Sequence, residues 1–134
     1  MALHIHPAQG TIVICDFNRS FIPPEMVKRR PVVVISPRFR ERADLCTVVP
    51  LSTSIPDPIM PYHCELDIGT PLPEPFIETR MWVKADLVVT VALQRLIMPF
   101  LGKEPSGKRI YDTRIITPDD LARIQNCVRH ALGI

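Results

Sequence analysis

The chain has 134 residues, enough for one domain with its own core, and is 46% hydrophobic and 22% charged, the composition of a globular rather than a disordered protein. Its 16 Lys and Arg and 14 Asp and Glu leave a net charge of +2, so the total charge points to no particular partner. Proline is unusual, with 15 residues against 5 glycines. Because proline costs about 3 kcal/mol inside a helix, this composition argues against a helical bundle and favours short strands joined by stiff loops.

Runs of apolar and β-branched residues, separated by proline-bearing loops, predict a chain built mainly of strands. In chain order, the expected strands span residues 11–17, 31–36, 45–50 and 62–67, with a further strand in the first part of 81–90. Residues 96–101 and 109–115 flank the turn sequence Pro105-Ser106-Gly107-Lys108, which predicts a hairpin.

The C-terminal segment, Thr117 to Leu132, predicts a helix. Thr117 suits the N-cap, Pro118 the first helical position, and two aspartates follow where the helix dipole favours negative charge. Apolar residues then recur at helical spacing, and Gly133 suits the end of the helix. This apolar stripe needs a surface to pack on. We therefore expect a mainly β fold, a small antiparallel barrel or curled sheet, with a C-terminal α-helix across it.

Several classes of protein have no support in the sequence. No apolar run approaches the roughly 20 residues of a membrane span, and the N-terminus lacks the pattern of a secretion signal, so we expect a cytoplasmic protein. The 4 cysteines form no C-x-x-C pair, and the 4 histidines show no metal-binding spacing, so we expect buried, reduced thiols and no metal site. Glycine-rich phosphate-binding loops are also missing, and we expect no cofactor.

The charges are unevenly distributed, with a basic segment at residues 19–42. It holds seven basic against two acidic residues, a balance of +5, whereas the rest of the chain holds nine against twelve, a balance of −3. Six of the seven are arginines, which bind phosphate oxygens bidentately, and this favours a nucleic-acid partner. A solubilising surface is the alternative interpretation. The basic residues flank both ends of the expected strand at 31–36, so they need not form one patch on a single subunit.

Three segments together carry a resemblance to a known family. They are GTIVICDF at residues 10–17, EMVKRRPVVVISP at residues 25–37, and VVPLSTS at residues 48–54. Lys84-Ala85-Asp86 and the C-terminal helix follow in the expected order. The chain thus resembles the MazF/PemK (Kid) toxins of type II toxin–antitoxin systems over nearly its whole length.

The resemblance implies a single domain, residues 1–134, with the SH3-like, CcdB–PemK-like β-barrel and a C-terminal helix. It implies a homodimer that cuts single-stranded RNA at specific sequences without a metal, leaving 2′,3′-cyclic phosphate and 5′-hydroxyl ends. A cognate antitoxin protein is the second implied partner. Compared with the family, residues 93–116 look like an added hairpin, and we expect residues 1–9 to be a flexible tail.

The same resemblance assigns roles to residues. Arg30, before the proline of the R-P motif, falls on a catalytic arginine, Ser52 on a catalytic threonine, and Glu25 on a glutamate linked to activity. An arginine can stabilise the charge that develops on phosphoryl oxygens, a hydroxyl can donate to them, and a carboxylate can accept the 2′-proton. Further RNA contacts are expected from Lys28, Arg29, Arg38, Arg40, Thr53 and Phe17.

Other interpretations remain open from sequence alone. Arg30 and Glu25 could form a surface ion pair, and Ser52 could bond its own backbone in a loop. The protein could also be a barrel homologue that cleaves nothing and binds RNA, an antitoxin or, like the CcdB toxins, DNA gyrase. The chain ends without an aromatic residue, which argues against the CcdB mode.

Overall fold

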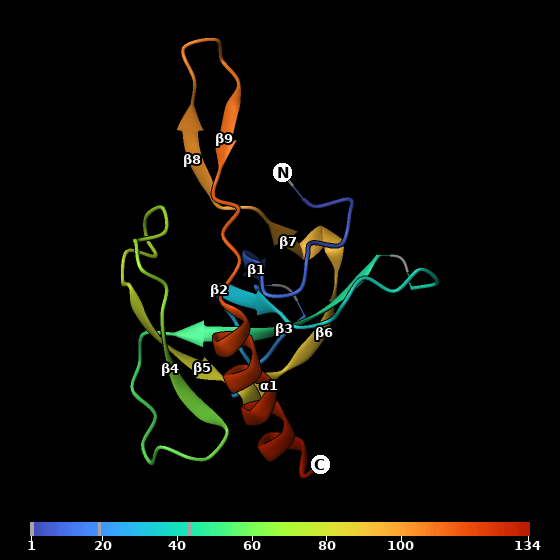
Figure 1. Cartoon of the computed structure of the whole chain (residues 1–134), viewed down its shortest axis with the longest axis vertical. Coiled ribbons are helices and arrows are strands. Elements are labelled where there is room, and N and C mark those ends of the chain that lie inside the picture. Colours follow the sequence, from blue (N-terminus) through green and yellow to red (C-terminus); the bar gives the residue numbers. More distant parts are fainter. Residues whose placement is uncertain (1, 19, 43) are drawn as a thin grey trace.

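The computed structural model describes residues 2–18, 20–42 and 44–134, and it is mainly β with one C-terminal helix (Figure 1). The strands are β1 (Ile12–Asp16), β2 (Arg29–Val34), β3 (Leu45–Ser52), β4 (His63–Asp67), β5 (Arg80–Lys84), β6 (Val89–Ala92), β7 (Leu96–Ile97), β8 (Phe100–Lys103) and β9 (Arg109–Tyr111). Two single-turn 3-10 helices, η1 (Ala85–Leu87) and η2 (Leu93–Arg95), flank β6, and the helix α1 spans Pro118–Leu132.

The main sheet is antiparallel and strongly bent around the long strand β3. Its order is β4-β5-β3-β2-β1-β7, with β6 also paired to β3. The first half of β3 pairs with β6, whereas its last two residues, Leu51 and Ser52, pair with Val83 and Trp82 of β5. Within the described residues no pairing joins β4 to β7, so the sheet is curled and open rather than the closed barrel that the resemblance implied.

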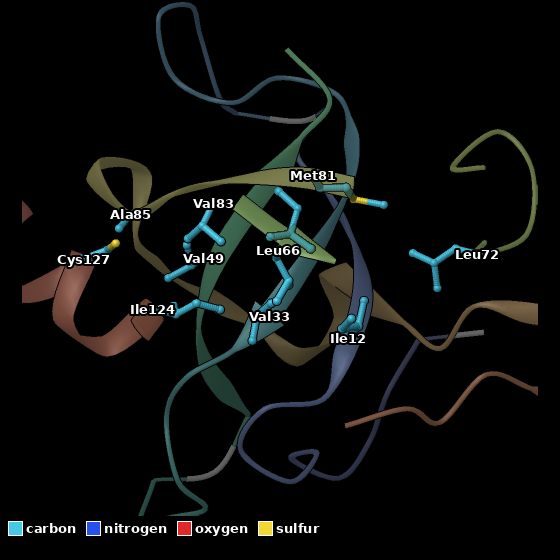
Figure 2. Packing of buried hydrophobic residues seen from close by; sticks show 11 residues of the cluster. Ile12, Val33, Val49, Leu66, Leu72, Met81, Val83, Ala85, Ile124 and Cys127 are labelled. Carbon is cyan, nitrogen blue, oxygen red and sulfur yellow. The ribbon is translucent and has the colours of Figure 1, made fainter. Parts of the chain in front are cut away.

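The central strands are buried on both faces, which explains their unbroken apolar sequences. On one face Ile12, Val33 and Val49 pack with Ile124 of α1 (Figure 2). On the other face the neighbouring residues Val13, Val32, Val34 and Val48 form a second cluster with Leu96, all with no more than trace exposure. The two clusters fix β1, β2 and β3 as a rigid platform from which the loops extend.

The C-terminal helix forms as expected from its caps. The Thr117 side chain accepts a hydrogen bond from the Asp120 backbone N–H at 3.1 Å, and Pro118 occupies the first turn. Gly133 ends the helix with a φ of 71°, a left-handed conformation that favours glycine. Ile124 and Cys127 are the buried residues of the helix, and Val128 packs partly buried beside them. The middle of the predicted apolar stripe therefore faces the sheet, whereas Leu132 at its end is 57% exposed.

The N-terminal segment is packed along the sheet, which differs from the expected flexible tail. His6 is 7% exposed, and its Nε2 lies 2.8 Å from the hydroxyl of the buried Ser36. The Arg38 guanidinium donates to the His6 carbonyl at 2.6 and 3.1 Å, and the Leu3 N–H donates to the Leu96 carbonyl. These contacts join residues 2–9 to Ser36, Arg38 and Leu96, which are distant in sequence, so a local pattern does not reveal them.

The hairpin is present but shorter than the expected segment 93–116. Only β8 and β9 form the two-stranded sheet, which projects away from the main sheet (Figure 1). Residues 93–97 belong to the main sheet through η2 and β7. In the described part of the chain, no helix is long and apolar enough to cross a membrane.

Candidate functional site

A hollow of about 290 Å³ lies where the start of β2 meets the end of β3. It is lined by Lys28, Arg29, Arg30, Pro31, Leu51, Thr53, Pro75, Phe76, Ile77, Glu78 and Met81. The pairing of β2 with β3 explains this meeting, because Val32 faces Pro50 in an antiparallel register. Arg30 lies two residues before Val32 in β2, and Ser52 lies two residues after Pro50 in β3, so both belong to the strand ends that meet here. The R-P motif at the start of β2 and the Pro-Leu-Ser-Thr motif at the end of β3 therefore meet at the same hollow.

Arg30 has hydrogen-bonding capacity that the protein does not use. Its Nε atom is buried, and among the described residues it has no hydrogen-bond partner. A buried donor without a partner costs free energy, on the order of 1–3 kcal/mol, and is therefore uncommon in a folded protein. Arg30 also lines the hollow, and a guanidinium in that position is suited to bind an oxyanion such as a phosphate.

The two hydroxyls at the end of β3 have different environments. Ser52 is 7% exposed, and its Oγ accepts a hydrogen bond from the Ser54 backbone N–H at 3.2 Å, as in the alternative interpretation of a loop cap. The Ser52 proton remains available for donation. Thr53 is exposed and lines the hollow directly. Both hydroxyls thus lie at the strand end that carries the resemblance.

The structure does not bring Glu25 to the hollow of Arg30. The Glu25 carboxylate accepts the Ile22 backbone N–H at 2.9 Å, and the residue lines a different hollow of about 180 Å³, together with Asp86. No ion pair joins Glu25 to Arg30 in the described part of the chain. The carboxylate that lines the hollow of Arg30 belongs instead to Glu78, which the sequence analysis did not single out.

Phe17 is a core residue rather than an exposed one. It is 1% exposed, belongs to the core, and packs edge-on against Phe21 with the ring centroids 5.2 Å apart. A ring buried in this way has no free surface for stacking on a base. The burial of Phe17 thus argues against the expected RNA contact, because an aromatic residue at the end of a predicted strand looks the same in sequence whether it faces core or solvent.

The basic segment is divided between the two ends of β2. Lys28, Arg29 and Arg30 line the hollow, whereas Arg38 and Arg40 follow the other end of the strand. Six residues of β-strand separate these ends by about 20 Å. Arg38 and Arg40 are thus absent from the hollow of this protomer, and Arg19 lies outside the described residues.

The loop between β4 and β5 forms the remaining wall of the hollow and was missed by the sequence analysis. It is tied down from the far side by Arg114, whose Nη1 donates to the carbonyls of Ile68 and Thr70 at 2.8 and 2.5 Å. The same guanidinium bonds the Asp112 carboxylate, with Nε 3.0 and 3.1 Å from its two oxygens. These hydrogen bonds hold the pKa of Asp112 below its ordinary value, against the opposing effect of burial.

The cysteines and histidines form no site of their own. Burial raises the pKa of Cys15 to about 12, and burial together with the neighbouring Cys127 raises that of Cys64 to about 12. These thiols therefore stay protonated and are poor nucleophiles or ligands. In the described ranges, no three His, Cys, Asp or Glu side chains gather as a metal-binding group.

Fold and site together define a small curled-sheet protein with a cationic hollow at the junction of two strands. The sequence profile of the PemK-like, MazF-like toxins of type II toxin–antitoxin systems matches residues 8–132. An uncharacterized protein of Haemophilus influenzae is 30% identical over 138 residues, covering 95% of this chain and 90% of its own. The uncharacterized protein YifN of Escherichia coli K12 is 33% identical over 114 residues, 72% of this chain and 75% of its own.

Solved structures agree with the fold. An endoribonuclease from a mycobacterial species, in complex with its cognate antitoxin, superposes with a TM-score of 0.62 at 19% identity, with 96% of each chain covered. The family profile spans almost the whole chain, so this protein belongs to the PemK-like, MazF-like toxin family.

Proposed function

We propose that this protein is the toxin of a type II toxin–antitoxin pair and that it cleaves single-stranded RNA in the hollow at the β2–β3 junction. The observation that carries the proposal is that Lys28, Arg29 and Arg30 line one hollow together with Thr53, and Ser52 is the neighbour of Thr53 at the end of β3. Membership of the toxin family supports it, as does the similar mycobacterial protein described as an endoribonuclease.

In the proposed reaction the 2′-oxygen attacks the adjacent phosphorus and the bond from phosphorus to the 5′-oxygen breaks. The products are a 2′,3′-cyclic phosphate and a 5′-hydroxyl. Arg30 binds the non-bridging oxygens and stabilises the charge that develops on them, and a hydroxyl of Ser52 or Thr53 donates to the same oxygens. The nucleophile and the leaving group belong to the RNA itself, so we propose a metal-independent reaction.

The proton from the 2′-hydroxyl needs an acceptor. The resemblance suggested Glu25, but Glu25 lines a different hollow, whereas Glu78 lines the hollow of Arg30. We therefore assign this role to Glu78, with the proton returning to the 5′-oxygen as the bond breaks. Arg30 is a poor base because a guanidinium keeps its charge.

The proposal includes two protein partners and a location. A cognate antitoxin, of the kind bound to the similar mycobacterial protein, would neutralise the toxin by covering the cationic hollow. We propose a homodimer in the cytoplasm, the state that the family resemblance implies.

The test is a cleavage assay on a long single-stranded RNA in EDTA, with the fragment ends mapped. The unmodified protein should give discrete cuts with cyclic-phosphate ends, and Arg30→Ala should not. Well-folded protein that binds RNA without cutting it would identify a non-cleaving homologue. If it neither cuts nor binds several RNAs but inhibits DNA gyrase, a CcdB-like function replaces the proposal.

A further inference from the structure

A second and larger hollow, of about 500 Å³, adjoins the first. It lies between the paired strands β1 and β7, the loop that precedes β5, and the base of the β8–β9 hairpin. The residues that line it are Ile14, Arg29, Pro73, Glu74, Pro75, Phe76, Ile97, Pro99 and Phe100. Arg29, Pro75 and Phe76 line both hollows, so whatever occupies one comes within reach of the other.

The chemistry of the second hollow fits a flat organic group attached to an anion. Its volume lies within the range of about 300–1,000 Å³ that is usual for small-molecule sites. Among the described residues that line it, only Arg29 and Glu74 carry charge, and the rest are apolar or aromatic. The ring of Phe100 packs edge-on against the ring of Tyr111, with the two ring centroids 5.8 Å apart. Phe100 is nevertheless 43% exposed, so part of its ring surface stays free. A nucleobase joined to a phosphate has this combination of properties.

The hairpin continues the cationic surface beyond the hollow. Between Phe100 and Tyr111 it carries three exposed basic residues, Lys103, Lys108 and Arg109, against one acidic residue, Glu104. The Arg109 guanidinium lies 5.4 Å from the centroid of the Phe100 ring, so it holds positive charge at the edge of the hollow. Figure 1 shows the hairpin standing clear of the main sheet, where a nucleic-acid strand could follow it. The charge thus favours an RNA strand over a second copy of this cationic arm.

We propose that the second hollow binds the base of a nucleotide next to the cleaved phosphate and that the hairpin selects the cut sequence. The base stacks on Phe100, and Arg29 binds the phosphate between the two hollows. Lys103, Lys108 and Arg109 then follow the RNA backbone outward. The inference rests on the proposed function, because it assumes that RNA is the substrate at Arg30.

The experiment compares the sequences around the cuts made by three single variants and the unmodified protein on a random RNA pool. Phe100→Leu keeps apolar volume but removes the ring, and it should lower kcat/KM by about 5- to 150-fold, the usual effect of losing one base–aromatic stack. It should also relax the base preference at one position beside the cut. Phe100→Tyr should retain both. Leu101→Ala is the matched control, because Leu101 is an exposed neighbour on the same hairpin, 54% exposed, that lines neither hollow.

Each contrary outcome has its own meaning. If the unmodified protein neither cleaves nor binds the pool, the proposed function fails and this inference fails with it. If it cleaves and Phe100→Leu keeps the same rate and base preferences as Leu101→Ala, only the nucleotide site is overturned. Light scattering on the same samples supplies the third outcome, since a dimer that becomes a monomer in Phe100→Leu would identify the hollow as an interface between copies of the chain.

Discussion

Arginines flank both ends of β2, but their contacts differ between the two ends. At the start of the strand, Arg30 lines a hollow with a buried Nε that no described residue satisfies. Beyond the other end, Arg38 bonds the His6 carbonyl, and Arg42 reaches the Thr47 hydroxyl at 3.4 Å and lies 5.4 Å from the centroid of the Phe39 ring. The Nε of Arg42, like that of Arg30, is buried without a partner among the described residues. The unpartnered Nε is therefore common to both ends, and what distinguishes Arg30 from Arg38 and Arg42 is its place in the lining of the hollow.

The largest expected effect separates these two ends directly. Arg30→Ala should lower the cleavage rate by about 1,000-fold, the upper range for losing one preorganised donor to a developing oxyanion. Arg38→Ala is the matched control, with the same change at the other end of β2, and it should cut within about threefold of the unmodified protein. Initial rates on a short RNA measure both, and equal loss in the two variants would remove the distinction between the ends.

The next effect concerns the two carboxylates. Glu78→Gln should slow cleavage by roughly 100-fold, the lower range for a general base, because Glu78 lines the hollow of Arg30. Glu25→Gln should change the rate little, since Glu25 lies in a separate hollow and bonds the Ile22 N–H. Cleavage rates of the two variants under single-turnover conditions show which carboxylate accepts the 2′-proton. The reverse order would restore Glu25 and imply that a second protomer completes the site.

The anchored end of β2 should matter for stability and not for cleavage. In the neutral ring of His6, Nδ1 donates to the Pro7 carbonyl at 2.6 Å, so the Ser36 hydroxyl donates to Nε2. Ser36→Ala removes that donor and the acceptor of the Thr47 N–H, and should cost about 1–3 kcal/mol of unfolding free energy in urea titrations. A variant as stable as the unmodified protein would show that residues 2–9 contribute little to the fold.

The smallest effect is the pH dependence of the Asp112–Arg114 ion pair, whose arginine bonds the β4–β5 loop. The pKa of Asp112 is held below its ordinary value of 3.8, mainly by hydrogen bonds from Arg114. The lowered pKa means that its stabilisation is complete above about pH 5 and is lost as the pH falls below 3.8 through the folded-state value. Asp112→Asn should therefore be less stable than the unmodified protein at pH 7, and the difference should shrink as the pH falls toward 2.

The control for Asp112→Asn is Glu65→Gln, which removes an ion pair to Arg80 in which both side chains are largely exposed. Exposed pairs contribute little, so this variant should unfold near the unmodified midpoint at every pH. Urea unfolding of both variants from pH 7 down to pH 2 provides the comparison. A constant difference between Asp112→Asn and the unmodified protein across that range would show that the carboxylate does not titrate with the pKa shift described here.

Much of the fold follows from local sequence because the signals are local. The unbroken apolar runs at residues 12–15 and 32–34 became strands buried on both faces, and the caps at Thr117 and Gly133 bound the helix as expected. The site was partly accessible in the same way. Arg30 belongs to β2 and Ser52 to β3, and these two strands pair antiparallel. Sequence also indicated that the basic residues flank opposite ends of one strand.

What the tertiary structure alone decided involves contacts between distant parts of the chain. Residues 2–9 pack against Ser36 and Arg38, and Arg114 reaches back to the loop after β4, in each case by hydrogen bonds that a local pattern does not encode. The same holds for Glu78, which lines the hollow although nothing in its sequence context marks it. Local sequence fixed the strands and caps through short-range propensity. The walls of the two hollows depended on how far-separated loops pack, which is a property of the whole chain.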